Sequence, residues 1–216
     1  MNEKIGLVVV AGMMSFSSVA SAKDAGLELG GRVGYGVPVG KVTAETSDGM
    51  NDLISGKIPL QLDVGYRLNP HVLIGGYLQY GIGFMSADEC DADGVSCSAN
   101  VVRLGAQMTY HFAPITVDGG WLGAGIGYEW LNLSVKAGGL SQNLQSRGFE
   151  FLNLQGGYDF VVADGFRLGP FALLTVAQYS SATIELPGGG SFSSSEFDKA
   201  IHSWLVLGVK GSFGAL

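Results

Sequence analysis

The chain has 216 residues, a formal net charge of −7 and 14% charged residues, which suits a single domain. The negative charge argues against nucleic acid as a partner, because proteins bind nucleic acid through basic contacts to phosphate. Glycine is abundant at 35 residues but has no G-X-Y period, which excludes a collagen-like chain.

The first 22 residues have the features of a secretory signal peptide. Lys4 precedes the apolar run IGLVVVAGMMSF, and Ala20-Ser21-Ala22 forms an A-x-A cleavage site. The run is too short to cross a bilayer as a helix, and no later segment has 18 consecutive apolar residues. We predict a signal peptide at 1–22 and an exported domain at 23–216, either a soluble β-sandwich or a transmembrane β-barrel.

Eight segments alternate apolar and polar residues with the period of two that a strand shows when its faces meet different surroundings. In KIPLQLDVGYRL (57–68), all even-numbered residues are apolar and the odd-numbered ones include three charged residues. The seventh segment is apolar on both faces, and we place Leu168, Leu174 and Val176 outward. The eight predicted strands lie at 26–40, 57–68, 71–85, 101–113, 120–133, 150–163, 166–181 and 200–213.

The connections between these strands alternate in length. Those after the second, fourth and sixth strands are short, at 69–70, 113–119 and 163–165. Those after the other strands have roughly a dozen residues each and are rich in Ser, Gly, Asp and Asn. Short turns on one side and long loops on the other are typical of an outer-membrane barrel, with both chain ends on the short-turn side.

The charged residues of the predicted strands share one face, and the central part of the other face has none. A soluble sandwich would bury the apolar face and turn the charged one to water. The length of the strands, the aromatic residues at both strand ends and the loop rhythm favour the barrel instead. The predicted interior charges are Glu28, Arg32, Lys57, Asp63, Arg67, Arg103, Glu129, Asp159, Arg167 and Lys210.

An eight-stranded barrel is narrow enough for side chains to fill it. Unpaired charges are costly at low dielectric, so we expect these ten residues to form ion pairs and hydrogen bonds. Inward glycines such as Gly123, Gly125 and Gly127 leave room for longer side chains. We therefore favour a filled interior, and a thin polar channel is the alternative.

Together, the signal peptide, the eight alternating strands, the loop rhythm and the closing segment HSWLVLGVKGSF resemble the small eight-stranded outer-membrane barrels of the OmpA, OmpX and opacity-protein type. The resemblance covers essentially all of residues 23–216. It implies an outer-membrane location and contact with membrane lipid. Because this type of barrel hosts adhesins, structural proteins, channels and lipid-modifying enzymes, it does not fix the function.

Catalysis on such a barrel requires a nucleophile and a base within hydrogen-bond reach. His71 and His111 fall at the predicted periplasmic strand ends, and His202 lies near the outer end of the last strand, beside Ser203. Adjacent strand residues point to opposite faces, so His202 and Ser203 do not form a pair. We expect no enzymatic activity and no cofactor, and a lipid-modifying enzyme is the weaker alternative.

The segment DECDADGVSC, residues 88–97, contains both cysteines and lies in the second long loop. Export to an oxidising compartment predicts a Cys90–Cys97 disulfide. Glu89, Asp91 and Asp93 followed by Gly94 resemble the start of a calcium loop, but Asn100 stands where that loop needs a bidentate Glu. The main interpretation is a solvated, closed loop, and weak calcium binding is the alternative.

The sequence as a whole predicts an all-β protein, an eight-stranded antiparallel up-and-down transmembrane β-barrel in the cell outer membrane. We expect a monomer that contacts membrane lipid and presents four extracellular loops to a ligand, in a structural or surface-interaction role. The alternative function is a narrow channel for ions or small solutes.

Overall fold

The computed structural model describes residues 25–41, 49–86, 90, 95–138, 140–185, 190–194 and 201–214. The predicted signal peptide at 1–22 lies outside this part of the chain. The described elements are β1 (Gly26–Gly40), α1 (Met50–Leu53), β2 (Ile54–Asn69), β3 (Val72–Met85), β4 (Val95–His111), β5 (Gly119–Ala137), β6 (Leu140–Ala163), β7 (Phe166–Glu185), β8 (Ser191–Ser194) and β9 (Ile201–Gly214). Among these residues, no helix has both the length and the apolar composition needed to span a bilayer.

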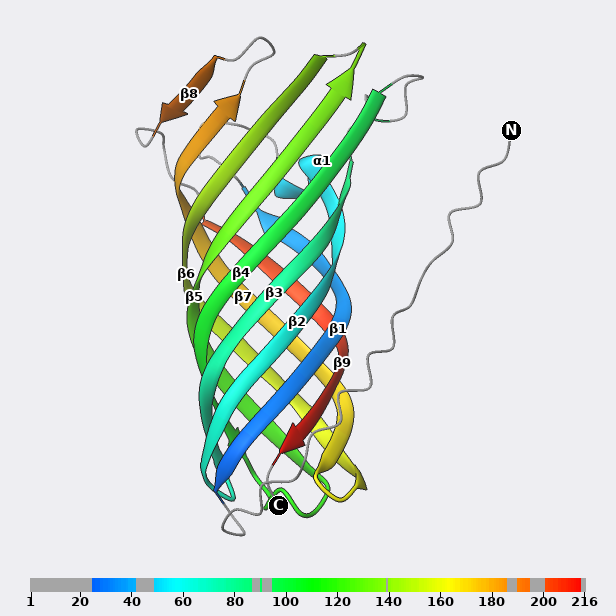
Figure 1. Cartoon of the computed structure of the whole chain (residues 1–216), viewed down its shortest axis with the longest axis vertical. Coiled ribbons are helices and arrows are strands. Elements are labelled where there is room, and N and C mark those ends of the chain that lie inside the picture. Colours follow the sequence, from blue (N-terminus) through cyan, green and yellow to red (C-terminus); the bar gives the residue numbers. More distant parts are fainter. Residues whose placement is uncertain are drawn as a thin grey trace, which may run out of the picture.

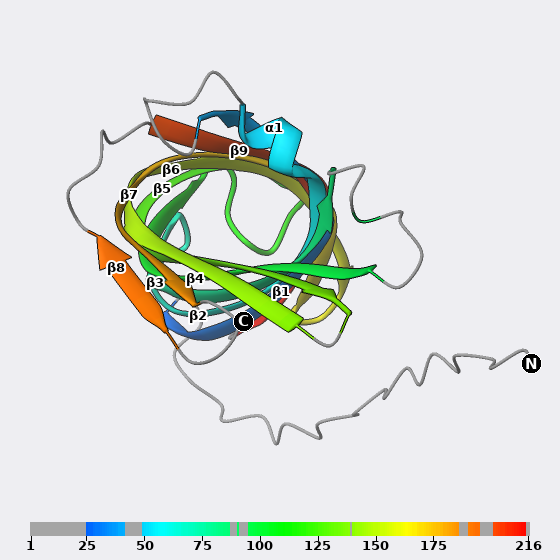
Figure 2. The same cartoon turned by 90° about the horizontal axis from the view of Figure 1, so that it is seen from above.

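The eight long strands close into an antiparallel barrel, as Figures 1 and 2 show. Each strand from β1 to β7 pairs with the next, and β9 pairs with both β7 and β1 to complete the ring. The short connections and the C-terminal end of β9 lie at one end of the barrel, and α1 and β8 lie at the other (Figure 1). The predicted eight-stranded up-and-down topology is therefore confirmed.

The outer surface of the barrel is apolar, because alternate residues of every strand point away from the interior. Leu168 and Leu174 of β7 are exposed on this surface, and Val176 shares their phase, so the outward placement predicted for the seventh strand is correct. Exposed aliphatic side chains form the middle of the surface, among them Leu62, Leu78, Leu104, Ile126 and Leu207. A surface of this kind is suited to hydrocarbon rather than water.

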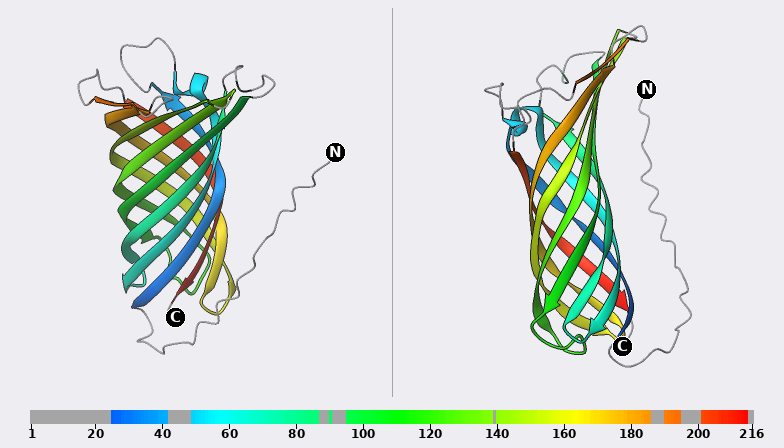
Figure 3. Two further views of the ribbon diagram at one scale, coloured as in Figure 1. Left: turned by 45° about the horizontal axis from the view of Figure 1, so that its top comes forward. Right: turned by 90° about the vertical axis from the view of Figure 1, so that its left-hand side faces the viewer.

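The structure corrects the expected loop lengths on the outer side. Instead of a long third loop, β5 continues to Ala137 and β6 begins at Leu140. Gly138 turns the chain with a positive φ of 57°, which glycine adopts without strain. In the fourth loop, β8 pairs with β7 between Ala182 and Glu185. Strand pairing satisfies the backbone hydrogen bonds of these polar segments, so β4 to β7 rise beyond the rest of the barrel (Figure 3).

Candidate functional site

The interior of the barrel contains all ten charged residues that the sequence placed there, and each of them is buried. They come from seven strands, β1, β2, β4, β5, β6, β7 and β9. They lie in an inner cluster near the short turns, a middle layer in which Arg32 and Asp63 bind glutamines, and an outer cluster near α1.

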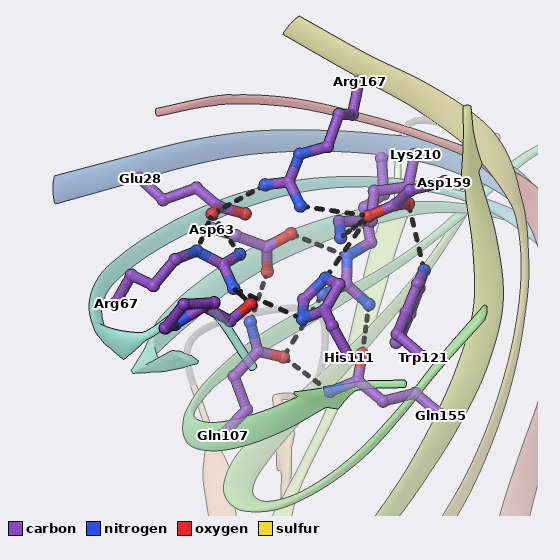
Figure 4. A network of polar contacts seen from close by, with 12 residues as sticks. Glu28, Asp63, Arg67, Gln107, His111, Trp121, Gln155, Asp159, Arg167 and Lys210 are labelled. Carbon is purple, nitrogen blue, oxygen red and sulfur yellow. Dashed lines mark hydrogen bonds and ion pairs between the residues drawn. The ribbon is translucent and has the colours of Figure 1, made fainter. Parts of the chain in front are cut away.

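The inner cluster is centred on two carboxylates, Glu28 and Asp159 (Figure 4). Arg67 Nε donates to Glu28 Oε2 at 3.0 Å, and Arg167 Nη2 lies 2.7 Å from the same oxygen. Lys210 Nζ lies 3.3 Å from Asp159 Oδ2. Trp121 and His111 complete the surroundings of Asp159, with the indole Nε1 donating to Oδ1 at 3.0 Å and the imidazole Nε2 3.4 Å from Oδ2.

The middle layer joins Arg32 and Asp63 to a group of glutamines. Arg32 Nε donates to Asp63 Oδ2 at 2.6 Å, and a guanidinium nitrogen also donates to Gln155. Gln107 and Gln61 each donate to Asp63 Oδ1 at 2.8 Å. These amides fill the cross-section between the two charged clusters with paired donors and acceptors, as a low-dielectric interior requires.

Gln79 continues this network toward the outer cluster. Its amide Nε2 donates to Gln61 Oε1 at 2.8 Å, and Arg103 Nη1 donates to Gln79 Oε1 at 3.1 Å. A continuous chain of hydrogen bonds therefore links Asp63 to Arg103.

The outer cluster holds two carboxylates around Arg103, which is completely buried. Arg103 Nε donates to Glu150 Oε2 at 2.6 Å and lies 3.7 Å from Glu129 Oε2. Tyr77 Oη donates to the other oxygen of Glu150 at 2.8 Å. Tyr179 Oη donates to Glu129 Oε1 at 2.7 Å, and each of these buried charges therefore has polar partners.

His202 belongs to the same cluster and is fully buried. Its Nε2 lies 2.9 Å from Glu129 Oε1, and its ring stacks on Tyr179 with centroids 4.1 Å apart. Lys57 Nζ lies 3.8 Å from the centre of the Trp204 ring, a cation–π contact. The sequence placed His202 at the outer strand end, but it did not identify Glu129 as its partner.

Glu150 is the interior charge that the sequence analysis missed. The pairing of β6 with β7 shifts between Glu150 and Leu152, so Phe151 forms a β-bulge. The bulge reverses the alternation, and Glu150 and Asn153 both point inward although they are three residues apart. The adjacent apolar pair Phe151-Leu152, both turned away from the interior, is the sequence signal that could have revealed it. With Glu150, the buried charged side chains among the described residues are six basic and five acidic.

The outer end of the interior is closed by apolar side chains. Met50 of α1 and Ile54 at the start of β2 are fully buried, and they pack with Val101, Leu131 and Trp204. The helix lies at the rim of the barrel at this end, as the view from above shows (Figure 2), and contacts β1 and β2. The first predicted loop thus contributes a cap that its sequence had not revealed.

The other sequence-predicted sites fall partly outside the described residues. Cys90 and Cys97 form the predicted disulfide. The calcium ligands considered, Glu89, Asp91 and Asp93, lie outside the described residues. Within the described ranges, no group of three or more His, Cys, Asp or Glu side chains is arranged to hold a metal ion.

Reduction of the Cys90–Cys97 disulfide should expose the second loop to proteases while leaving the barrel intact. The bond closes a ring of eight residues and removes freedom that the open loop would otherwise have. We expect the Cys90→Ser/Cys97→Ser variant to be cut between β3 and β4 several times faster than the native protein. Limited proteolysis of the refolded protein, followed by mass spectrometry, measures this rate. An unchanged rate at this loop would show that the disulfide does not restrain it.

Comparison with known proteins places this architecture in the outer membrane. A major outer membrane protein from Thermus thermophilus has a TM-score of 0.59 and 12% identity, over 88% of this chain and 98% of that one. OprG of Pseudomonas aeruginosa gives 0.54 and 12%, over 89% and 96%. AlkL in lipid bilayers gives 0.52 and 12%, over 99% and 96%. At such identities the likeness shows the fold alone, which is that of the small eight-stranded outer-membrane barrels.

No curated protein matches the chain. A family model does match, that of the autotransporter β-domain, and it covers residues 39–214, most of the chain and all but the beginning of the barrel. The chain is an outer-membrane β-barrel protein, and it belongs to the autotransporter β-domain family.

Proposed function

We propose that the barrel is a closed, non-catalytic scaffold that anchors its outer segments in the membrane and presents them for interaction at the cell surface. The observation that carries this proposal is the filled interior. Six basic and five acidic side chains, joined by glutamines, occupy the barrel from the short turns to the outer cluster. Met50 and Ile54 then cap the outer cluster, which leaves the segments above the membrane as the surface available to a partner.

The same network argues against a channel for ions or small solutes. Arg32, Asp63 and Gln107 bind one another across the barrel, so a solute would have to displace paired groups. Breaking such pairs in a low-dielectric interior costs several kcal/mol at each layer. A surface role requires no such opening.

Single-channel recording tests this proposal. The full chain, refolded and inserted into a planar phospholipid bilayer, should give no discrete openings at moderate voltage. Folding is verified on the same sample by the altered gel mobility of the unheated barrel. Steady openings from folded protein would contradict the scaffold and would favour the channel, with Arg32, Arg67 and Arg103 as pore-lining residues to substitute next.

With the interior filled, the outer segments are the part of the protein available to a partner. They include α1, the disulfide-closed loop and the raised strands β4 to β7. Loops and extensions on a rigid scaffold are where binding commonly resides.

A further inference from the structure

The raised part of β4 to β7 has two different faces. On the face that continues the barrel interior, Leu133 and Leu144 pair with each other and pack against the buried core. On the opposite face, which continues the lipid-facing surface, the side chains are mostly amides and hydroxyls. We call this second surface the amide face, and its residues are Ser98, Asn100, Asn132, Ser134, Asn143, Gln145 and Thr183.

One row of the amide face crosses four strands at a single level. Asn100 of β4 pairs with Asn132 of β5, which pairs with Gln145 of β6, which pairs with Thr183 of β7. Asn132 donates to Asn100 Oδ1 at 2.9 Å, and Gln145 donates to Asn132 Oδ1 at 2.8 Å. These contacts hold the amides in fixed orientations, so their remaining donors and acceptors face outward as an ordered array.

The position of the row relative to the membrane follows from the strand register. Tyr128 and Trp130, whose rings lie 4.7 Å apart, precede Asn132 on the same face of β5. Arg147 is the cross-strand partner of Trp130. Aromatic and basic side chains of this kind mark the interface between hydrocarbon and headgroups. Two residues further along a tilted strand rise about 5 Å, which places the row within the headgroup layer.

The shape and chemistry of the amide face suit a carbohydrate. A concavity of about 330 Å³ lies against it. Its lining consists of Leu133 and Leu144, which alternate with the amide-face residues along β5 and β6, and of Asn100, Asn132, Ser134, Asn143, Gln145 and Thr183. Its polar lining carries no ionisable side chain, but supplies amides and hydroxyls that both donate and accept hydrogen bonds. Sugar hydroxyls also do both, so a sugar ring can satisfy such an array where a purely anionic or apolar group cannot.

We propose that the amide face binds the carbohydrate headgroup of a membrane glycolipid that surrounds the barrel. The face is continuous with the lipid-facing surface and lies at headgroup level, so a glycolipid whose acyl chains pack below Trp130 brings its sugars directly to Asn132 and Gln145. A soluble sugar would have to enter the same layer without that anchorage. The proposal adds a ligand class to the scaffold and does not depend on whether the interior conducts.

Nanodiscs provide the test with the full refolded chain. They are assembled from phosphatidylcholine with a few mole per cent of rough-type lipopolysaccharide as the glycolipid probe, and native mass spectrometry counts the glycolipids retained. The double variant Asn132→Leu/Gln145→Leu removes the centre of the row, and we expect its retention to fall about tenfold, as the loss of two hydrogen-bonding groups predicts.

Gln142→Leu is the matched control. Gln142 lies on β6, is exposed like Gln145, and pairs with Val135 on the opposite face. Its replacement should leave retention unchanged, and gel mobility verifies that all variants fold. Equal retention by the double variant, or an equal loss in Gln142→Leu, would overturn the assignment to the amide face. Deacylated oligosaccharide that binds as tightly as the intact glycolipid would overturn the membrane source.

Discussion

Replacement of Arg103 by methionine should destabilise the barrel by about 3–5 kcal/mol, the usual cost of breaking a buried ion pair from one side. Arg103 is completely buried and lies between Glu129 and Glu150, which are also completely buried. Methionine fills much of the space but offers no charge. The two carboxylates would then repel each other without the guanidinium between them. The hydrogen bonds from Tyr77 and Tyr179 would remain but carry no positive charge.

Urea unfolding of the protein in phospholipid vesicles, followed by tryptophan fluorescence, measures the change. Arg147→Met is the matched control, because Arg147 is an exposed arginine on β6 whose Nε bonds Ser181. It should cost less than about 1 kcal/mol, as exposed polar pairs do. Adding Glu150→Gln to Arg103→Met should restore part of the loss, because one uncompensated charge disappears. Equal effects of Arg103→Met and Arg147→Met would contradict a tightly paired interior.

The strand phases were predictable because each strand separates two environments of opposite polarity. The outward-facing residues were predicted correctly even for the seventh strand, which is apolar on both sides, and Leu168 and Leu174 face outward as expected. Alternation also placed ten charged residues in the interior. It could not say which carboxylate meets which base, because partners such as Glu129 and His202 are 73 residues apart in sequence.

Three features escaped the sequence for physical reasons. Glu150 turns inward through a bulge, and one inserted residue changes the phase of everything beyond it. The rise of β5 and β6 above the aromatic residues was hidden because one face there carries amides and hydroxyls, a composition that is also typical of loops. The cap formed by Met50 depends on a short helix whose four residues carry little helical signal of their own.

The amide face and the filled interior differ in how much of their hydrogen-bonding capacity is left for a ligand. Inside the barrel, polar side chains are largely occupied with one another, as Gln61 and Gln79 are, so few of their groups are directed at a ligand. On the raised strands, side chains such as Gln145 are paired within the row but still reach solvent or headgroups. Selective recognition is therefore expected outside the wall, where hydrogen-bonding capacity remains.

If the barrel is embedded in a membrane, two leucines with nearly the same exposed fraction should respond very differently to substitution by arginine. Leu62 of β2 is 65% exposed, and Leu140 at the tip of β6 is 62% exposed. In water, arginine would be tolerated at both positions. Leu62 lies midway along β2, between Tyr66 toward the short turns and the outer end, so it faces the centre of the hydrocarbon layer.

Leu62→Arg should therefore lower the free energy of unfolding by about 2–4 kcal/mol, the cost of arginine at the bilayer midplane on a barrel's lipid face. Leu140→Arg should change it by less than about 0.5 kcal/mol, because the side chain stays in water. Both are measured by urea titration in phospholipid vesicles and again in detergent micelles. The difference between the variants should shrink in micelles, whose hydrocarbon deforms more easily around a charge. Equal stability of the two variants in vesicles would mean that the apolar belt does not face the membrane centre at Leu62.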